Sequence, residues 1–408
     1  MSDVRARAQK QKAAPVLVAF VFLTVWLGGS SCIVAAFLQP VLPGIWIAVA
    51  LSALFFLAPA AVLMRGFSGT YYPTAAVRLF VLRPFWYAIF AIPLMAIAAV
   101  VGAAVGLPFH SAGPGARWGM VAMSVFIVVT GVLGYIGTRR LTVKELRVDL
   151  PRLPSAFDGL RIVQFSDIHV GPHTSKEFMR RIAHAVQDTR PDVIVITGDQ
   201  VDDFAQDVHL FNGFFGGLEA PEGVFAVLGN HDVYAGWKAV HRGMQEAGFR
   251  VLLNESVALE RGGQRLWIAG TGDPAGSLWP PAGTESPAPD LPHTFAGIPE
   301  GAPVVALAHN PVLWPALVRQ GADLTLSGHT HYGQFAMPSR SWSLASMFLD
   351  HAMGAYREAG SLLYINPGTN FWGIAVRIGS FPEITVFDLH STDGEPTIVE
   401  TSQKTETG

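Results

Sequence analysis

The stretch Ser327–Gln334, SGHTHYGQ, places two imidazoles, His329 and His331, on either side of one threonine. It comes directly after the apolar run Leu324–Leu326. Short apolar runs with β-branched residues are typical of strands that are buried on both faces. A pair of histidines at the end of such a strand is a candidate ligand site, although one H-x-H motif alone is weak evidence.

The same arrangement, an apolar run followed by polar side chains, occurs at four earlier places in the chain. Residues 161–165 lead into Asp167 and His169, and residues 193–196 lead into Asp199. Residues 224–228 lead into Asn230, His231 and Asp232, and residues 304–307 lead into His309. In an open α/β sheet, ligands bind at the carboxyl ends of the strands. The repeated order therefore predicts that these groups meet at one site.

Helical patterns separate the predicted strands. Residues 175–187 repeat apolar side chains at helical spacing, and Thr174 with Glu177 has the spacing of a capping box. Residues 235–247 are a second candidate helix, whereas the Pro- and Gly-rich residues 274–292 predict a loop. Alternating strands and helices predict an α/β domain with a layered sheet.

Seven of the strand-end residues are candidate metal ligands: Asp167, His169, Asp199, Asn230, His309, His329 and His331. Carboxylate, amide and imidazole ligands without a thiolate suit Mn²⁺, iron, Zn²⁺ or Co²⁺. Seven ligands exceed the needs of one ion, so we expect two divalent ions bridged by a carboxylate. Such a pair activates water as a nucleophile and clamps the attacking and leaving oxygens of an in-line displacement.

The ordered set D-x-H, G-D, G-N-H-D, H and G-H-x-H resembles the calcineurin-like metallophosphoesterases, over about residues 158–390. Within that superfamily, GHTHYGQ and the later PEITVFDL are most similar to a bacterial membrane-associated branch. The resemblance implies a layered β-sandwich with flanking helices. It also implies that the first metal is held by Asp167, His169 and His331, that Asp199 bridges, and that Asn230, His309 and His329 complete the second metal site.

The resemblance gives His231 and Asp232 catalytic roles: His231 near the substrate phosphate, and Asp232 orienting its ring. Three positions depart from related patterns. Asp202 stands where purple acid phosphatases have a tyrosine ligand, and Asp203 stands where the serine/threonine protein phosphatases have an arginine. Tyr332 replaces a glycine usual in the bacterial branch, which predicts a reshaped pocket rim.

The first third of the chain has a different composition. Four long apolar runs, about 16–37, 41–64, 85–107 and 118–137, each reach the roughly 20 residues that cross a bilayer as a helix. Residues 1–140 contain ten Lys and Arg but a single acidic residue, Asp3. We therefore predict a four-helix transmembrane region over residues 1–140. The absence of charged side chains within the four runs indicates an anchor more than an ion path.

Basic residues lie before the first run, between the second and third, and after the fourth. Lys and Arg remain on the cytoplasmic side, so both ends of the region are expected there, in a multi-pass protein of the inner membrane. A cleaved signal peptide over the first run is the alternative, and it would change this topology. The single cysteine, Cys32, leaves the second part without disulfides.

The predicted organisation is a transmembrane domain over 1–140, a linker over 141–157, a catalytic domain over 158–390 and a disordered tail over 391–408. The expected function is a membrane-anchored phosphoesterase that faces the cytoplasm and acts on a lipid-linked or nucleotide substrate. Its expected partners are that substrate and the bilayer, with no nucleic acid, because the second part is acidic. The alternative is a membrane transporter or sensor whose metal-binding domain is regulatory.

Overall fold

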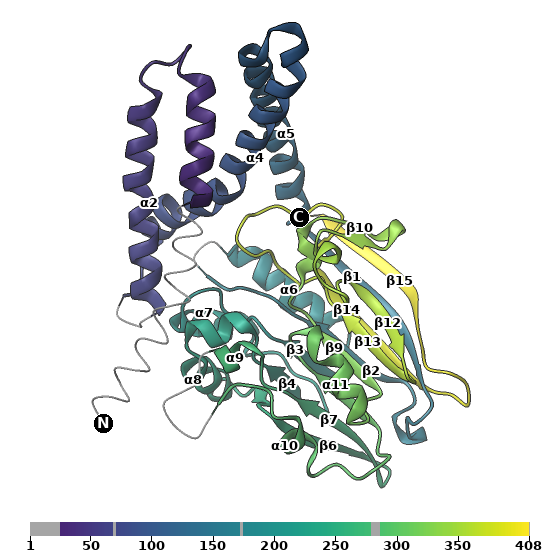
Figure 1. Ribbon diagram of the computed structural model, residues 1–408. Helices are drawn as coiled ribbons and strands as arrows, with labels where there is room; N and C mark the ends of the chain where they lie inside the picture. Colours follow the sequence, from purple (N-terminus) through teal and green to yellow (C-terminus); the bar gives the residue numbers. More distant parts are fainter. Residues whose placement is uncertain (1–24, 68–70, 172–173, 279–285, 408) are drawn as a thin grey trace. The chain divides into compact units, whose positions relative to one another are not determined.

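The computed structural model describes residues 25–67, 71–171, 174–278 and 286–407 (Figure 1). The chain divides into two compact units, Met1–Val132 and Leu133–Gly408. The predicted boundary near residue 140 therefore falls a few residues late, because the last turn of the fourth apolar run packs with the second unit.

The first unit consists of apolar helices. Its described elements are a helix over Val25–Leu38, α2 (Ile45–Phe67), α3 (Ala75–Val77), η1 (Arg78–Leu82), α4 (Arg83–Gly106), η2 (Leu107–Phe109) and most of α5 (Ala112–Gly137). Three stretches, Ile45–Leu63, Ala75–Phe109 and Ala112–Gly137, are long and apolar enough to cross a membrane. The first predicted run lies partly outside the described residues, so four spans remain a prediction. The last helix begins at Ala112, six residues before the predicted start.

Small residues bring α4 and α5 into close contact. A methyl group on Gly102 would overlap the carbonyl of Gly115, and one on Gly119 would overlap the carbonyl of Ala98. Glycines that let two backbones approach are typical of packed membrane helices, where no hydrophobic effect drives association. Large apolar side chains such as Trp118 and Val128 are exposed on the outside of α5, as lipid-facing residues would be.

The second unit contains two sheets and one short hairpin (Figure 1). The seven-stranded sheet has the order β15-β1-β14-β2-β3-β4-β5, and the six-stranded sheet has the order β12-β13-β9-β8-β7-β6. The strands are β1 (Arg140–Leu150), β2 (Leu160–Phe165), β3 (Val193–Thr197), β4 (Val224–Val227), β5 (Arg250–Val251), β6 (Glu255–Arg261), β7 (Gln264–Gly270), β8 (Val304–Leu307), β9 (Leu324–Ser327), β10 (Ala336–Met337), β11 (Trp342–Ser343), β12 (Gly354–Glu358), β13 (Ser361–Ile365), β14 (Glu383–Ser391) and β15 (Thr397–Thr407).

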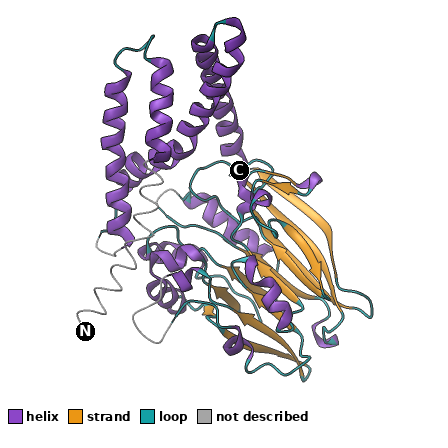
Figure 2. Ribbon diagram, viewed as in Figure 1, coloured by secondary structure: helices purple, strands orange, loops and turns teal. Residues whose placement is uncertain are grey.

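Alternate residues of the central strands enter two different cores. In β3, Val193 and Val195 join a core shared by both sheets, whereas Ile194 and Ile196 pack against helices. Figure 2 shows the sheets with helices beside them. These helices are α6 (Lys176–Asp188), α7 (Val208–Phe215), α8 (Asn230–Glu246), α9 (Ala275–Leu278), α10 (Leu291–Phe295) and α11 (Trp314–Arg319). The two-faced burial explains the nearly continuous apolar runs, and it confirms the predicted layered α/β domain.

The predicted linker and tail are both wrong, because each forms a strand. Residues 140–150 form β1, which pairs parallel with β14 and antiparallel with β15 (Thr397–Thr407). The tail is predicted to be disordered because it is polar, but it forms the outer strand of the sheet, which includes Glu400, Lys404 and Glu406. Charged side chains on an edge strand are a common protection against pairing between molecules.

Two smaller expectations also change. The cap of α6 is Ser175 rather than Thr174, because the Ser175 hydroxyl accepts from the backbone N–H of Phe178. The second helix starts at Asn230, inside the G-N-H-D motif, and bends at Gly236, where φ is 125°. Residues Ala275–Leu278 and Leu291–Phe295 of the predicted loop are short helices.

Candidate metal centre

The strand ends hold the candidate ligands in an unusual backbone conformation. Five of the seven have positive φ: Asp167 (54°), His169 (44°), Asp199 (53°), His329 (72°) and His331 (48°). Residues other than glycine seldom adopt this region, and the cost of doing so is met at functional sites by the surrounding structure. The conformation turns these side chains out of the strands and toward one another.

Glycines in the motifs make room for the carboxylates. A methyl group on Gly229 would overlap the carboxylate of Asp199, and one on Gly328 would overlap that of Asp167. The glycines of G-N-H-D and G-H-x-H are therefore needed for close approach of the neighbouring loop. This explains why the motifs contain glycine at these places.

Asp167, His169 and His331 form a first cluster of convergent donor atoms. Nε2 of His169 lies 3.0 Å from Nε2 of His331, which lies 3.3 Å from Oδ1 of Asp167. All three side chains are buried. The three come from the ends of β2 and β9, which belong to different sheets, so the cluster forms only when the two sheets pack together.

Asp199, Asn230, His309 and His329 form a second cluster. Oδ1 of Asn230 lies 2.8 Å from Nδ1 of His329 and 3.2 Å from Nε2 of His309. Nε2 of His309 lies 3.2 Å from Oδ2 of Asp199. The four residues follow β3, β4, β8 and β9, so both sheets again contribute.

Asp199 belongs to both clusters. Its Oδ2 atom lies 3.6 Å from Nε2 of His169 and 3.2 Å from Nε2 of His309. Asp167 and Asp199 are also within reach of a common ion, because their oxygens and a nitrogen of His309 lie within 4.8 Å of one another. The donor set therefore fits divalent cations, and Asp199 lies between the two clusters, where the resemblance implies a bridging ligand.

The electrostatic surroundings suit cation binding. Burial raises the pKa of Asp167, because the carboxylate has lost its contact with water. Burial lowers the pKa of His329 to about 3, and burial followed by Arg377 holds that of His331 well below its ordinary value. Both rings are consequently neutral at physiological pH, which is the form that ligates metals.

His309 differs from these two rings. Burial lowers its pKa, but the carboxylate of Asp199, followed by Asp167 and Asp273, outweighs burial and raises the pKa well above the ordinary value. A proton on His309 balances the charge of Asp199 in the metal-free protein. A metal ligand must release that proton, so cation binding at this cluster is expected to be proton-linked.

His231 lies beside both clusters, and one of its ring nitrogens is within 4.8 Å of donor atoms of His169 and Asp199. Its backbone N–H donates to Oδ1 of Asp199 over 2.8 Å, and its Nδ1 lies 2.8 Å from the carbonyl oxygen of Asp202. Burial lowers the pKa of His231, but the carboxylates of Asp199, Asp202 and Asp203 raise it by more. The pKa of His231 therefore lies above its ordinary value. A protonated His231 can therefore stabilise a phosphate or donate its proton to a leaving oxygen.

The predicted role of Asp232 in orienting His231 is wrong. The carboxylate of Asp232 accepts from the backbone N–H groups of Gly229, Gln200 and Val201, at 2.9–3.1 Å. These three bonds hold the start of α8 against the loop after β3, and they use the carboxylate of Asp232. Asp202 supplies the contact to the ring instead, and its carboxylate lies 3.4 Å from Nδ1 of His169.

The motif analysis missed two buried residues near the site. Arg377 donates from Nη2 to Nδ1 of His331 over 2.6 Å, and no motif surrounds it. Asp273 follows β7 (Gln264–Gly270), next to the strand that bears His309, and among described residues its Oδ2 atom has no hydrogen-bond partner. Its position after a strand was the available signal, because β7 itself was a predicted strand.

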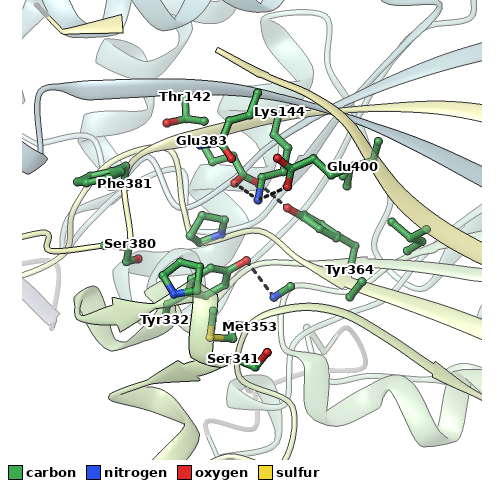
Figure 3. Close-up of a pocket in the computed structure, with 18 of the residues that line it drawn as sticks. Thr142, Lys144, Tyr332, Ser341, Met353, Tyr364, Ser380, Phe381, Glu383 and Glu400 are labelled. Carbon is green, nitrogen blue, oxygen red and sulfur yellow. Dashed lines mark hydrogen bonds and ion pairs between the residues drawn. The ribbon is translucent and has the colours of Figure 1, made fainter. Parts of the chain in front are cut away.

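A separate cavity of about 770 Å³ lies beside the loop that carries His331. Figure 3 shows Lys144, Tyr332, Tyr364 and Glu383 around it. Tyr332 follows His331 directly, and its hydroxyl donates to the carbonyl of Ile365 over 2.8 Å. None of the seven candidate ligands lines this cavity. Tyr332, which replaces the glycine usual in the bacterial branch, therefore lines a cavity that is separate from the candidate metal centre.

Comparison with known proteins supports the same chemistry. Residues 160–333 match the family model described as calcineurin-like phosphoesterase, and this span includes all seven candidate ligands. A "Transmembrane protein with metallophosphoesterase domain" from Danio rerio is 30% identical over 64% of this chain and 60% of its own length. The protein of the same name from Bos taurus is 31% identical over 65% of this chain and 62% of its own length.

A bacterial relative is also similar. The "Uncharacterized metallophosphoesterase YkuE" of Bacillus subtilis is 29% identical over 64% of this chain and 90% of its own length. The chain thus spans about three fifths of the two vertebrate relatives. Among solved structures, an archaeal phosphodiesterase aligns with a TM-score of 0.32 and 13% identity, over 59% of this chain and 100% of that one.

Proposed function

We propose, from the premise that this chain belongs to the calcineurin-like phosphoesterase superfamily, that it is a membrane-anchored hydrolase of phosphoester bonds that requires two divalent cations. The observation that carries the proposal is the position of Asp199 between two clusters of donor atoms, 3.6 Å from Nε2 of His169 and 3.2 Å from Nε2 of His309. One shared carboxylate between two ligand sets is what a dinuclear hydrolytic centre needs.

In this proposal Asp167, His169 and His331 hold one cation, and Asn230, His309 and His329 hold the other, with Asp199 in common. Two such cations supply Lewis acidity and an activated water at neutral pH. The residues of the chain perform the rest. The left-handed backbone at the strand ends orients the ligands before substrate arrives, so that little reorganisation is needed during the reaction.

His231 is the proposed proton donor. It lies next to Asp199 and Trp372, with ring centroids of His231 and Trp372 5.6 Å apart. The carbonyl of Asp202 accepts from Nδ1, so the Nε2 proton is the one that can be given to a leaving oxygen. Trp372 restricts the space beside the ring and is in a position to exclude water from it.

The membrane topology is part of the proposal. Three described helices are long and apolar enough to cross a bilayer, and two relatives carry "transmembrane" in their names. The basic residues at the ends of the runs favour an inner-membrane protein whose catalytic domain faces the cytoplasm. Protease accessibility of β15 in inside-out and right-side-out vesicles tests this orientation. Cleavage from the outside of intact cells would contradict it.

The hydrolase is tested with the full-length protein in detergent micelles or nanodiscs. Bound metals are removed by chelation, and Mn²⁺, Fe²⁺, Zn²⁺ and Co²⁺ are returned singly. Bis(p-nitrophenyl) phosphate, p-nitrophenyl phosphate, a nucleotide pyrophosphate and a phospholipid in vesicles serve as substrates. We expect chelation to abolish release of product and at least one ion to restore it. No hydrolysis of any ester with any ion would overturn the proposal.

The choice of substrate follows from the anchor. A tether confines the enzyme to the membrane surface, where lipid-linked phosphoesters are concentrated, and it also suits soluble nucleotides near that surface. We propose the lipid-linked class first. The transporter or sensor remains the alternative. The three described stretches contain no Asp or Glu, and their charged residues, Arg78, Arg83 and Arg117, lie near the N-terminal ends of these stretches.

A further inference from the structure

Exposed apolar side chains in the second unit gather in one segment. Among the described residues after Gly137, eight large hydrophobic side chains are exposed, and six of them lie within Met337–Leu349, called the apolar segment here. They are Met337, Trp342, Leu344, Met347, Phe348 and Leu349; the other two are Val312 and Val399. Scattered exposed hydrophobic residues are ordinary, but a cluster marks an interaction surface.

The apolar segment is folded with its small side chains inside. Ser343 is fully buried and Ala345 is buried, whereas the neighbouring Phe348 is 79% exposed and Met347 is 62% exposed. Hydrogen bonds between Ser343 and Ser346 fix this orientation, including one of 2.6 Å from the Ser346 hydroxyl to the Ser343 carbonyl. The outward position of the large side chains is therefore built into the local structure.

The apolar segment is attached directly to the metal loop. The backbone N–H of Leu344 donates to the carbonyl of Phe335 over 2.8 Å. Gly333, two residues after His331, packs so closely on Leu344 and Ala345 that a methyl group would collide with them. A ligand of the candidate centre and the exposed surface thus belong to one rigid part of the fold.

The same part of the fold contacts the end of α5 (Ala112–Gly137). The N–H of Arg377 donates to the carbonyl of Gly134 over 3.0 Å, and Gly137 is packed against the carbonyl of Arg377. The next residue, Ile378, exchanges backbone hydrogen bonds with Gln334 and Ala336, which directly precede the apolar segment. Residues 377–378 thus connect the last turn of a predicted span to the chain that leads into this surface.

These contacts indicate which partner covers the apolar segment. The last turn of a membrane-crossing helix lies at the bilayer surface, so a surface attached to that turn lies close to lipid headgroups. The apolar segment has the composition of an interfacial anchor, since it contains Trp342, Phe348 and aliphatic residues. Its single charged residue is Arg340, which is basic and suits anionic lipid.

We propose that the apolar segment Met337–Leu349 inserts into the interfacial layer of the bilayer that holds the spans and so places the metal centre against phosphoesters of membrane lipids. The insertion stands on the contacts above, whereas the choice of lipid substrate rests on the proposed function. A lipid headgroup could then reach the centre without leaving the membrane entirely. The segment would act as a docking element and not as a catalytic one.

Depth measurement tests the insertion. Full-length protein with Cys32→Ser receives Phe348→Cys and a nitroxide label, and it is reconstituted in vesicles of phosphatidylcholine and phosphatidylglycerol. Val312→Cys and Val399→Cys are matched controls, because both side chains are exposed in the same unit. We expect the label at 348 to collide with oxygen and to be shielded from a water-soluble nickel complex, with the reverse at 312 and 399.

Equal exposure of the three labels to the nickel complex would overturn the proposal. Dipolar broadening at 348 in vesicles would also overturn it, because a second copy of the chain would then cover the segment. Met347→Cys repeats the measurement at a neighbouring exposed site and guards against a local defect in one variant.

Activity separates docking from chemistry. Replacing Met347 and Phe348 with serine should lower hydrolysis of a vesicle-borne phosphoester about tenfold or more, because each lost insertion weakens interfacial binding. Hydrolysis of soluble bis(p-nitrophenyl) phosphate should be unchanged. Equal loss on both substrates would overturn docking as the role. If the unmodified protein hydrolyses nothing, the proposed function fails, while the label depths still decide the insertion.

Discussion

Replacing Arg377 with methionine tests how the metal centre is supported. Arg377 is fully buried, and its guanidinium donates to Nδ1 of His331 over 2.6 Å, to the carbonyl of Pro367 over 2.7 Å and to that of Ser380 over 3.0 Å. The hydroxyl of Ser380, at 3.2 Å, and the carbonyl of Asn370 are further acceptors. Methionine fills a similar volume but donates no hydrogen bond, so all five acceptors lose this donor.

The magnitude follows from these contacts. An unsatisfied buried acceptor costs about 1–3 kcal/mol, although relief from burying a cation offsets part of the sum. We expect the free energy of unfolding to fall by about 3–5 kcal/mol and Tm by roughly 10 °C. His331 also loses the group that orients its ring, so the metal affinity of the first cluster should change as well.

The measurements are thermal unfolding of the full-length protein and metal titration by calorimetry, each on Arg377→Met and on Arg147→Met. Arg147 is the matched control, because its side chain is 49% exposed and water screens its ion pair with Asp149, at 2.9 Å. The reasoning would be refuted by an Arg377→Met protein that melts and binds metal as the Arg147→Met protein does.

Three further changes probe the centre. Asp199→Asn should reduce turnover and the affinity for the second metal by more than the roughly 10–100-fold that loss of a ligand's hydrogen-bond partner typically costs; two full-affinity metals per chain with normal turnover would contradict the bridging role. Asp202→Asn removes one of the carboxylates that raise the pKa of His231, so the alkaline fall in the pH–rate profile should move to lower pH; an unmoved profile would show that another group donates the proton. Burial raises the pKa of Asp273 from 3.8 to about 6, so the metal-free protein should lose up to about 3 kcal/mol of stability between pH 4 and 6. Stability is lost as the pH rises because the folded state holds this proton more tightly than the unfolded state. Asp273→Asn should abolish this pH dependence. Denaturant midpoints that change with pH equally in both proteins would exclude the assignment to Asp273.

The predicted metal ligands came together because their chemistry is local. Each ligand directly follows an apolar strand, and parallel strands end at the same edge of a sheet. The order of motifs therefore already implied a shared site, and the structure places Asp167, His169 and His331 in one cluster and Asn230, His309 and His329 in another. Long uncharged runs similarly revealed the apolar helices, since only length and hydropathy decide whether a helix can cross a bilayer.

Other features depended on distant partners and so left little trace in the sequence. The polar residues 397–407 have the composition of a tail, but they form a strand because they pair with the edge of β1. Arg377 contacts His331, which lies 46 residues earlier in the chain. Asp202 contacts the ring of His231, whereas the carboxylate of Asp232 accepts hydrogen bonds from three backbone N–H groups. A residue's own neighbours in sequence determine whether it forms a strand or a span, whereas its role at a site depends on which hydrogen-bonding groups the packed sheets bring against it.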